Sequence, residues 1–126
     1  MISRNIGDLL GLTMREVSIS ESKETMTLIT TDGREFMFLH DQSCCENVQI
    51  DDVNGDLSDL VGLPLCMCEE ATNNQSPRPE SAESFTWTFY KFATPKGYVN
   101  IKWLGTSNGC YSEDVSLYET ERNHAK

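Results

Sequence analysis

Residues 85–103, FTWTFYKFATPKGYVNIKW, decide the fold that this chain is expected to adopt. Apolar and polar side chains alternate on both sides of Pro95-Lys96-Gly97, and this period of two residues is typical of β-strands. The turn between them predicts a β-hairpin. We expect this hairpin to supply the centre of the core through Trp87, Phe89, Val99, Ile101 and Trp103.

Shorter segments of the same kind lie on either side of the hairpin. Downstream, Ser107-Asn108-Gly109 is a second turn, and residues 111–118 are predicted to form a third strand that places Val115 and Leu117 inward. Upstream, alternating residues predict about four short strands, with a hairpin turn at Asp32-Gly33. The C-terminal part of the chain is therefore predicted to be a three-stranded meander.

Helix signals are few. Asn5 and Asp56 are suitable N-caps for one or two short helices, which Gly11 and Gly62 would end. The predicted class is α+β, with a mainly antiparallel β-sheet. The length of 126 residues predicts one domain, residues 1–126. Residues 72–83, TNNQSPRPESAE, are polar and contain two prolines, so we expect a mobile internal loop there.

The net charge of −10 is concentrated in the middle of the chain. Residues 41–83 contain ten carboxylates and one arginine, a net of −9. Such a charge repels nucleic acid and anionic membranes and attracts basic protein surfaces. The candidate partner-binding residues are Asp51, Asp52, Asp56, Asp59, Glu69 and Glu70. No apolar run reaches the roughly 20 residues of a membrane-spanning helix, and the N-terminus lacks a signal peptide's apolar segment, so we expect a cytoplasmic protein.

The densest group of reactive side chains is residues 40–46, HDQSCCE. His40 and one of Cys44 or Cys45, with Cys66 and Cys68, would make a Cys3His zinc set, but these spacings do not build a zinc knuckle. Neighbours in sequence also seldom form a working Cys–His pair, and adjacent cysteines on a strand point apart, so reduced thiols are expected. The acidic segment 51–59 lacks the order of a calcium loop. The sequence predicts no metal, no cofactor and no enzymatic activity.

Two long segments carry a resemblance. FLHDQSCCENVQIDDVNGDLSDLVGLPL and TWTFYKFATPKGYVNIKWLGTSNGCYSEDVSLYE resemble a family of small proteins of unknown function encoded mostly in bacteriophages and prophages. The family's motifs are H-D-Q-x-C-C-E and G-x-S-N-G-x-Y-S-E, and the resemblance covers residues 35–119. It singles out the positions His40, Asp41, Cys44, Cys45, Glu46, Ser107, Asn108, Gly109, Tyr111 and Glu113. It does not include Cys66 and Cys68.

Three functions from different classes follow as hypotheses. The first is a non-enzymatic phage binding protein in the bacterial host cytoplasm. It would inhibit a defence or nucleic-acid-binding complex by imitating nucleic acid, as an anti-CRISPR does, and its partner would be a basic surface of a host protein or nucleoprotein complex. The second is a ligand-binding or catalytic domain in which His40 meets Glu113 or Tyr111. The third is a phage structural or assembly protein that forms homo-oligomers through the exposed face of the meander.

Overall fold

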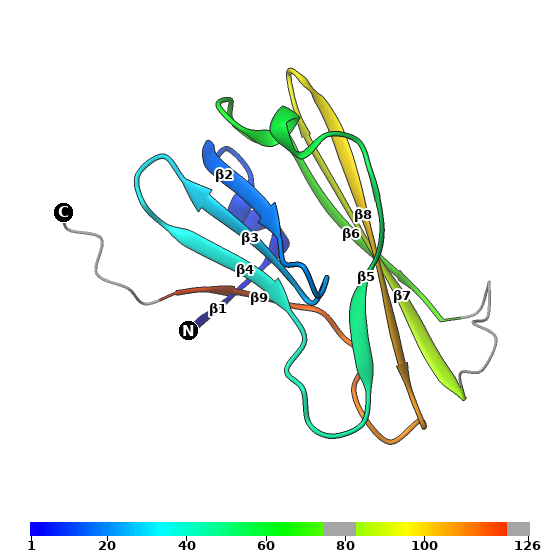
Figure 1. The fold of residues 1–126 in the computed structure, drawn as a ribbon. Helices are drawn as coiled ribbons and strands as arrows, with labels where there is room; N and C mark the ends of the chain where they lie inside the picture. Colours follow the sequence, from blue (N-terminus) through cyan, green and yellow to red (C-terminus); the bar gives the residue numbers. More distant parts are fainter. Residues whose placement is uncertain (75–82, 121–126) are drawn as a thin grey trace.

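The chain folds into two antiparallel β-sheets packed face to face, and a computed structural model describes residues 1–74 and 83–120 (Figure 1). The elements in chain order are β1 (Ile2–Arg4), η1 (Ile6–Leu9), β2 (Met14–Ile19), β3 (Thr25–Thr30), β4 (Glu35–Leu39), β5 (Asn47–Asn54), η2 (Leu57–Leu60), β6 (Met67–Asn73), β7 (Ser84–Thr94), β8 (Gly97–Ser107) and β9 (Ser116–Glu119). One sheet has the strand order β1-β9-β4-β3-β2 and the other β5-β8-β7-β6.

The prediction of an α+β class is wrong. In the described residues the helical segments are η1 and η2, two 3₁₀ helices of four residues each. Asp56 does cap η2, since its side chain accepts the backbone N–H of Ser58. However, the apolar residues with helical spacing after each cap cover a single turn before Gly11 or Gly62, so each helix ends after burying one leucine, Leu9 or Leu60.

The predicted C-terminal meander is also wrong in its third strand. β7 and β8 pair from Ser84↔Ser107 to Thr94↔Gly97, which confirms the hairpin. The chain then crosses to the other sheet, where β9 pairs with β4 and β1. Glu119 holds this arrangement, because its carboxylate accepts hydrogen bonds from Arg4 on β1 and from Arg34 beside β4.

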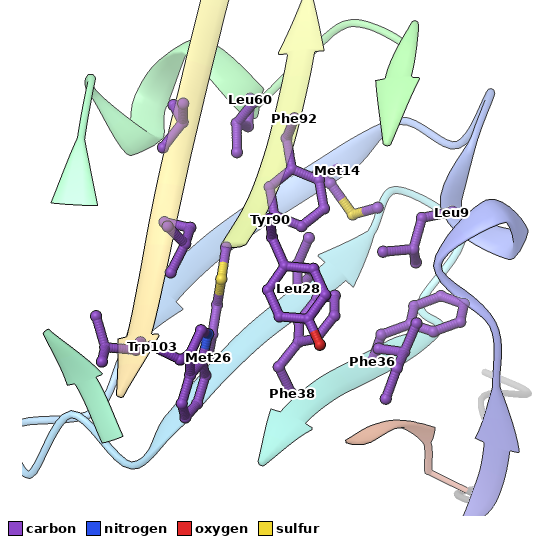
Figure 2. Close-up of a cluster of buried hydrophobic side chains, with 14 of the residues drawn as sticks. Leu9, Met14, Met26, Leu28, Phe36, Phe38, Leu60, Tyr90, Phe92 and Trp103 are labelled. Atoms are coloured by element: carbon purple, nitrogen blue, oxygen red, sulfur yellow. The ribbon is translucent and has the colours of Figure 1, made fainter. Parts of the chain in front are cut away.

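The core lies between the two sheets. Phe38 of β4 and Tyr90 of β7 reach toward each other, with ring centroids 4.6 Å apart (Figure 2). Val99, Ile101 and Trp103 are 0–1% exposed, which confirms their predicted place. Trp87 is buried, at 7% exposed, and Phe89 is exposed, but neither belongs to this central cluster. They have the opposite phase on β7, where Thr88, Tyr90 and Phe92 face inward because they pair with Trp103, Ile101 and Val99.

The predicted loop 72–83 begins too early. Thr72 and Asn73 belong to β6, where they pair with Thr88 and Trp87. Residues 75–82, which make up most of the predicted loop, lie outside the described part of the chain.

Candidate functional site

The segment from His40 to Glu46 forms the connection between β4 and β5, and Glu46 is its buried centre. Glu46 is 4% exposed. Its carboxylate lies 2.8 Å from Nε2 of His40 and accepts the backbone N–H groups of Ser43 and Cys44, each at 2.8 Å. A carboxylate removed from water needs such donors, and here the loop itself supplies them.

These donors lower the pKa of Glu46 from 4.5 to about 2. The hydrogen bond with His40 has the largest effect, and the N–H groups of Ser43 and Cys44 add to it while burial opposes it. The other ring nitrogen, Nδ1 of His40, lies 2.7 Å from the backbone carbonyl oxygen of Asp114. Both partners of the ring are acceptors, so the two contacts are made together when both ring nitrogens carry a proton.

The HDQSCCE segment, residues 40–46, therefore meets the chain just after the SNGCYSE segment, residues 107–113. Besides the contact between His40 and Asp114, the hydroxyl of Tyr118 donates to the carboxylate of Asp41. That hydrogen bond raises the pKa of Tyr118. The two contacts attach the β4–β5 connection to β9 and to the chain that leads into it.

Glu113, the buried acid of the second motif, faces away from His40. It is 7% exposed, and its carboxylate accepts the hydroxyl groups of Thr86 at 2.8 Å and Ser107 at 2.6 Å. Gly105 leaves room for it, because a Cβ there would lie 2.6 Å from the Glu113 carbonyl oxygen. The hydroxyl oxygen of Ser107 also accepts the N–H of Gly109. These bonds fix the turn after β8.

The remaining motif residues line the surface of this turn. Asn108 Oδ1 accepts the N–H of Cys110 at 3.0 Å, and Tyr111 is 36% exposed. Neither side chain has a hydrogen bond to His40 in the described structure. The hypothesis that His40 meets Glu113 or Tyr111 in a pocket is therefore not supported by the geometry.

The expectation of reduced thiols is wrong for one pair, because Cys44 and Cys45 form a disulfide. The argument from alternating strand faces fails since both residues lie in a loop, before β5 begins at Asn47.

Cys66 and Cys68 are free, and burial raises the pKa of Cys68 to about 11. Within residues 1–74 and 83–120, no three His, Cys, Asp or Glu side chains are placed to hold a metal ion.

The six predicted partner-binding acids do not form one surface. Asp51 and Asp52 lie on β5 and Glu69 and Glu70 on β6, the two outer strands of one sheet, which are roughly 14 Å apart at the usual strand spacing. Glu70 accepts the hydroxyl of Tyr90 at 3.0 Å. Asp56 and Asp59 belong to the η2 turn, where Asp56 is the N-cap and the Asp59 carbonyl accepts the hydroxyl of Thr94.

Asp51 and Asp52 instead share a groove with the β2–β3 turn. The groove has a volume of about 430 Å³ and is lined by Ile19, Ser20, Glu21, Lys23, Ile50, Asp51, Asp52 and Val53. The backbone N–H of Ile50 donates to the carbonyl of Lys23 at 2.7 Å, which joins the edges of the two sheets. Lys23 adopts a left-handed φ of 64° to present that carbonyl.

A family model described as a domain of unknown function, DUF7448, matches residues 7–117. This chain belongs to the DUF7448 family. The matched span runs from η1 into β9 and includes both motif segments. No curated protein and no solved structure matches the chain.

In this DUF7448 domain, sequence reasoning missed Glu21 and Lys23. Both are exposed residues of a hairpin turn, and nothing local distinguishes them from other polar turn residues. Their place beside Asp51 and Asp52 depends on how the two sheets pack, which the sequence pattern does not specify. No helix in the described ranges is long and apolar enough to cross a membrane.

Proposed function

We propose that this protein is a non-enzymatic binding protein that engages a basic surface of a bacterial host protein or nucleoprotein complex. In this proposal it is a phage or prophage product that imitates nucleic acid, as anti-CRISPR inhibitors do. The phage origin rests on the HDQSCCE and SNGCYSE motifs.

The observation that supports this function best is the acidic groove between β2 and β5, defined by the eight residues given above. Glu21, Asp51 and Asp52 are exposed there. The carboxylate of Asp51 lies 3.5 Å from Nζ of Lys102. This ion pair is long and exposed, so it contributes little to stability. Glu21 and Asp52 form no ion pair with a described residue. Three carboxylates and one cation, Lys23, line the groove, and the net negative charge that remains is complementary to a cationic partner.

The HDQSCCE segment is a weaker candidate for the binding surface. The side chains of His40 and Glu46 are 5% and 0% exposed, and each faces the other. Their polar atoms bond to the loop backbone and to Asp114, so these atoms hold the loop in place and are not presented to a ligand.

The test begins with capture of a partner on immobilised protein from a bacterial lysate, followed by affinity measurements with the purified partner at rising NaCl concentration. We expect affinity to fall steeply with salt, because exposed charges are screened beyond about 10 Å at 0.1 M. Replacing Glu21 and Asp52 together by lysine should weaken binding by roughly tenfold or more, mostly through slower association.

Asp114→Lys is the matched control, since Asp114 is exposed but lies outside the groove. It makes the same charge change per site and should alter the affinity much less. An affinity that is independent of salt, or one that His40→Ala abolishes while the double reversal leaves it intact, would contradict the proposal.

A further inference from the structure

The outer face of the β5-β8-β7-β6 sheet carries two exposed aromatic side chains, Tyr98 and Phe89. Because Val99, Ile101 and Trp103 of β8 point into the core, the alternating residues Tyr98, Asn100 and Lys102 point outward. The register places Ala93 beside Tyr98, Lys91 beside Asn100 and Phe89 beside Lys102. On β6, Glu69 lies opposite Lys91 and Ala71 opposite Phe89. Tyr98 is 64% exposed and Phe89 is 37% exposed.

Two hollows lie side by side on this face. One, of about 380 Å³, is lined by residues that include Phe89, Ala71 and Glu69. The other, of about 420 Å³, is lined by Met67, Ala93 and Tyr98 together with Lys91 and Asn100, and these last two residues also line the first hollow. The shared residues make the two hollows one continuous depression with an aromatic ring at each end.

The charges on this face are arranged so that two copies of it can complement each other. Lys91 stands next to Glu69 on the neighbouring strand, and both are exposed. A second copy turned through 180° about an axis that passes between Lys91 and Glu69 brings its own Glu69 toward Lys91 of the first copy, and its Lys91 toward Glu69. For a chain of net charge −10, most other pairings of two surfaces bring carboxylates together.

We propose that this face is the interface of a symmetric homodimer. Two copies pack sheet to sheet, and Tyr98 of each copy fills the hollow beside Phe89 of the other. This interface is separate from the acidic groove, which lies along the edges of β2 and β5.

The area of the face indicates how tightly the two copies should bind each other. β7 and β8 have 11 residues each, roughly 36 Å, and four strands span roughly 14 Å between the outer axes. The footprint is thus on the order of 500 Å², somewhat below the roughly 800 Å² per partner of a standard interface. We therefore expect a dimer that dissociates in the micromolar range.

Sedimentation velocity of the whole chain from about 1 to about 300 μM tests the proposal over this range of dissociation constants. The wild type should shift from monomer to dimer, and Tyr98→Glu should stay monomeric throughout with an unchanged circular dichroism spectrum. Leu10→Glu is the control, because Leu10 is also an exposed apolar residue, at 56%, but lies outside this sheet. It should dimerise as the wild type does.

A charge-swap series distinguishes this geometry from a generic apolar association. Lys91→Glu should weaken the dimer at least about tenfold, because it places carboxylates opposite Glu69 twice across the axis. Glu69→Lys combined with Lys91→Glu should restore it. A wild type that remains monomeric at the highest concentration, or a dimer that Tyr98→Glu leaves intact, would overturn the proposal. So would a double variant no better than Lys91→Glu alone.

Discussion

At the scale of single residues, Glu46 shows how a charged side chain can organise a loop. It is buried, but every contact of its carboxylate is with a donor from the same loop. The sequence indicates His40 as part of the reactive segment 40–46 and Glu46 through the resemblance, but it does not predict their contact, because that depends on a bend at residues 44 and 45. The Cys44–Cys45 disulfide was missed for the same reason. Both cysteines lie in a loop, where the alternation of side chains along a strand does not apply.

The first prediction concerns acid stability. The folded pKa of Glu46 is about 2 and its ordinary value is 4.5, so the unfolded chain binds the proton first as pH falls. The stabilisation from this carboxylate is thus complete above about pH 5 and is lost between about pH 4.5 and pH 2. Urea denaturation measured at several pH values gives the free energy of unfolding of both proteins. Wild type should exceed Glu46→Gln in this free energy most at neutral pH, and the difference should shrink as the pH falls from about 4.5 to about 2.

Glu24→Gln controls for the loss of one negative charge, because Glu24 is exposed on the β2–β3 turn and donates only its backbone N–H to a described side chain. The free energy of unfolding of Glu24→Gln should stay close to that of wild type at every pH. If the Glu46→Gln difference instead grew as the pH fell, the hydrogen bonds to this carboxylate would not be stabilising.

At the scale of elements, the sequence predicts the β7–β8 hairpin correctly. It also predicts which side chains of β8 face the core, but not which side chains of β7 do. On β8 the alternation is clear, and Val99, Ile101 and Trp103 are core residues as predicted. On β7 apolar side chains occupy both phases, with Phe85, Trp87 and Phe89 in one and Tyr90 and Phe92 in the other. The inward phase also includes two buried threonines, Thr88 and Thr94, so a rule that places threonine outside selects the wrong face.

Two further errors at this scale have a common cause. The third strand of the expected meander joins the other sheet, and the expected helices are single turns. Local patterns indicate that a strand or turn exists, but pairing partners are chosen by the packing of the whole core. β9 contributes Leu117, which is 6% exposed, to the shared core from the opposite sheet.

The second prediction tests this register with two aromatic residues on the same hairpin. Trp103→Ala should lower the free energy of unfolding by about 3–5 kcal/mol, because Trp103 is fully buried. Phe89→Ala should lower it by less than about 1 kcal/mol in the monomer, since Phe89 is 37% exposed on the outer face. Chemical denaturation at low protein concentration measures both. Equal losses would mean that Phe89 packs in the core and that the phase of β7 is reversed.

At the scale of the whole molecule, the acidic composition was clear from the sequence, but its arrangement was not. The six acids predicted to bind a partner are divided among two opposite sheet edges and the η2 turn. Counting charges gives the sign of the field around the protein, whereas the fold decides which carboxylates act together. It also separates acids that only repel their neighbours from acids that hold the backbone, as Asp52 and Asp56 illustrate.

The third prediction uses these two acids as a matched pair, because both are exposed and either replacement by alanine changes the net charge of −10 by one unit. Asp56 accepts the backbone N–H and the hydroxyl of Ser58, which lowers its pKa, whereas Asp52 has no such contact in the described structure. Thermal melting should show a lower Tm for Asp56→Ala at every salt concentration. Asp52→Ala should leave Tm within about 2 °C of wild type.

Added NaCl should raise the Tm of wild type by screening repulsion among the carboxylates, and it should raise the Tm of Asp52→Ala slightly less. If Asp52→Ala lost as much stability as Asp56→Ala, Asp52 would be a structural residue and the groove beside it would be a poor candidate for a partner-binding surface.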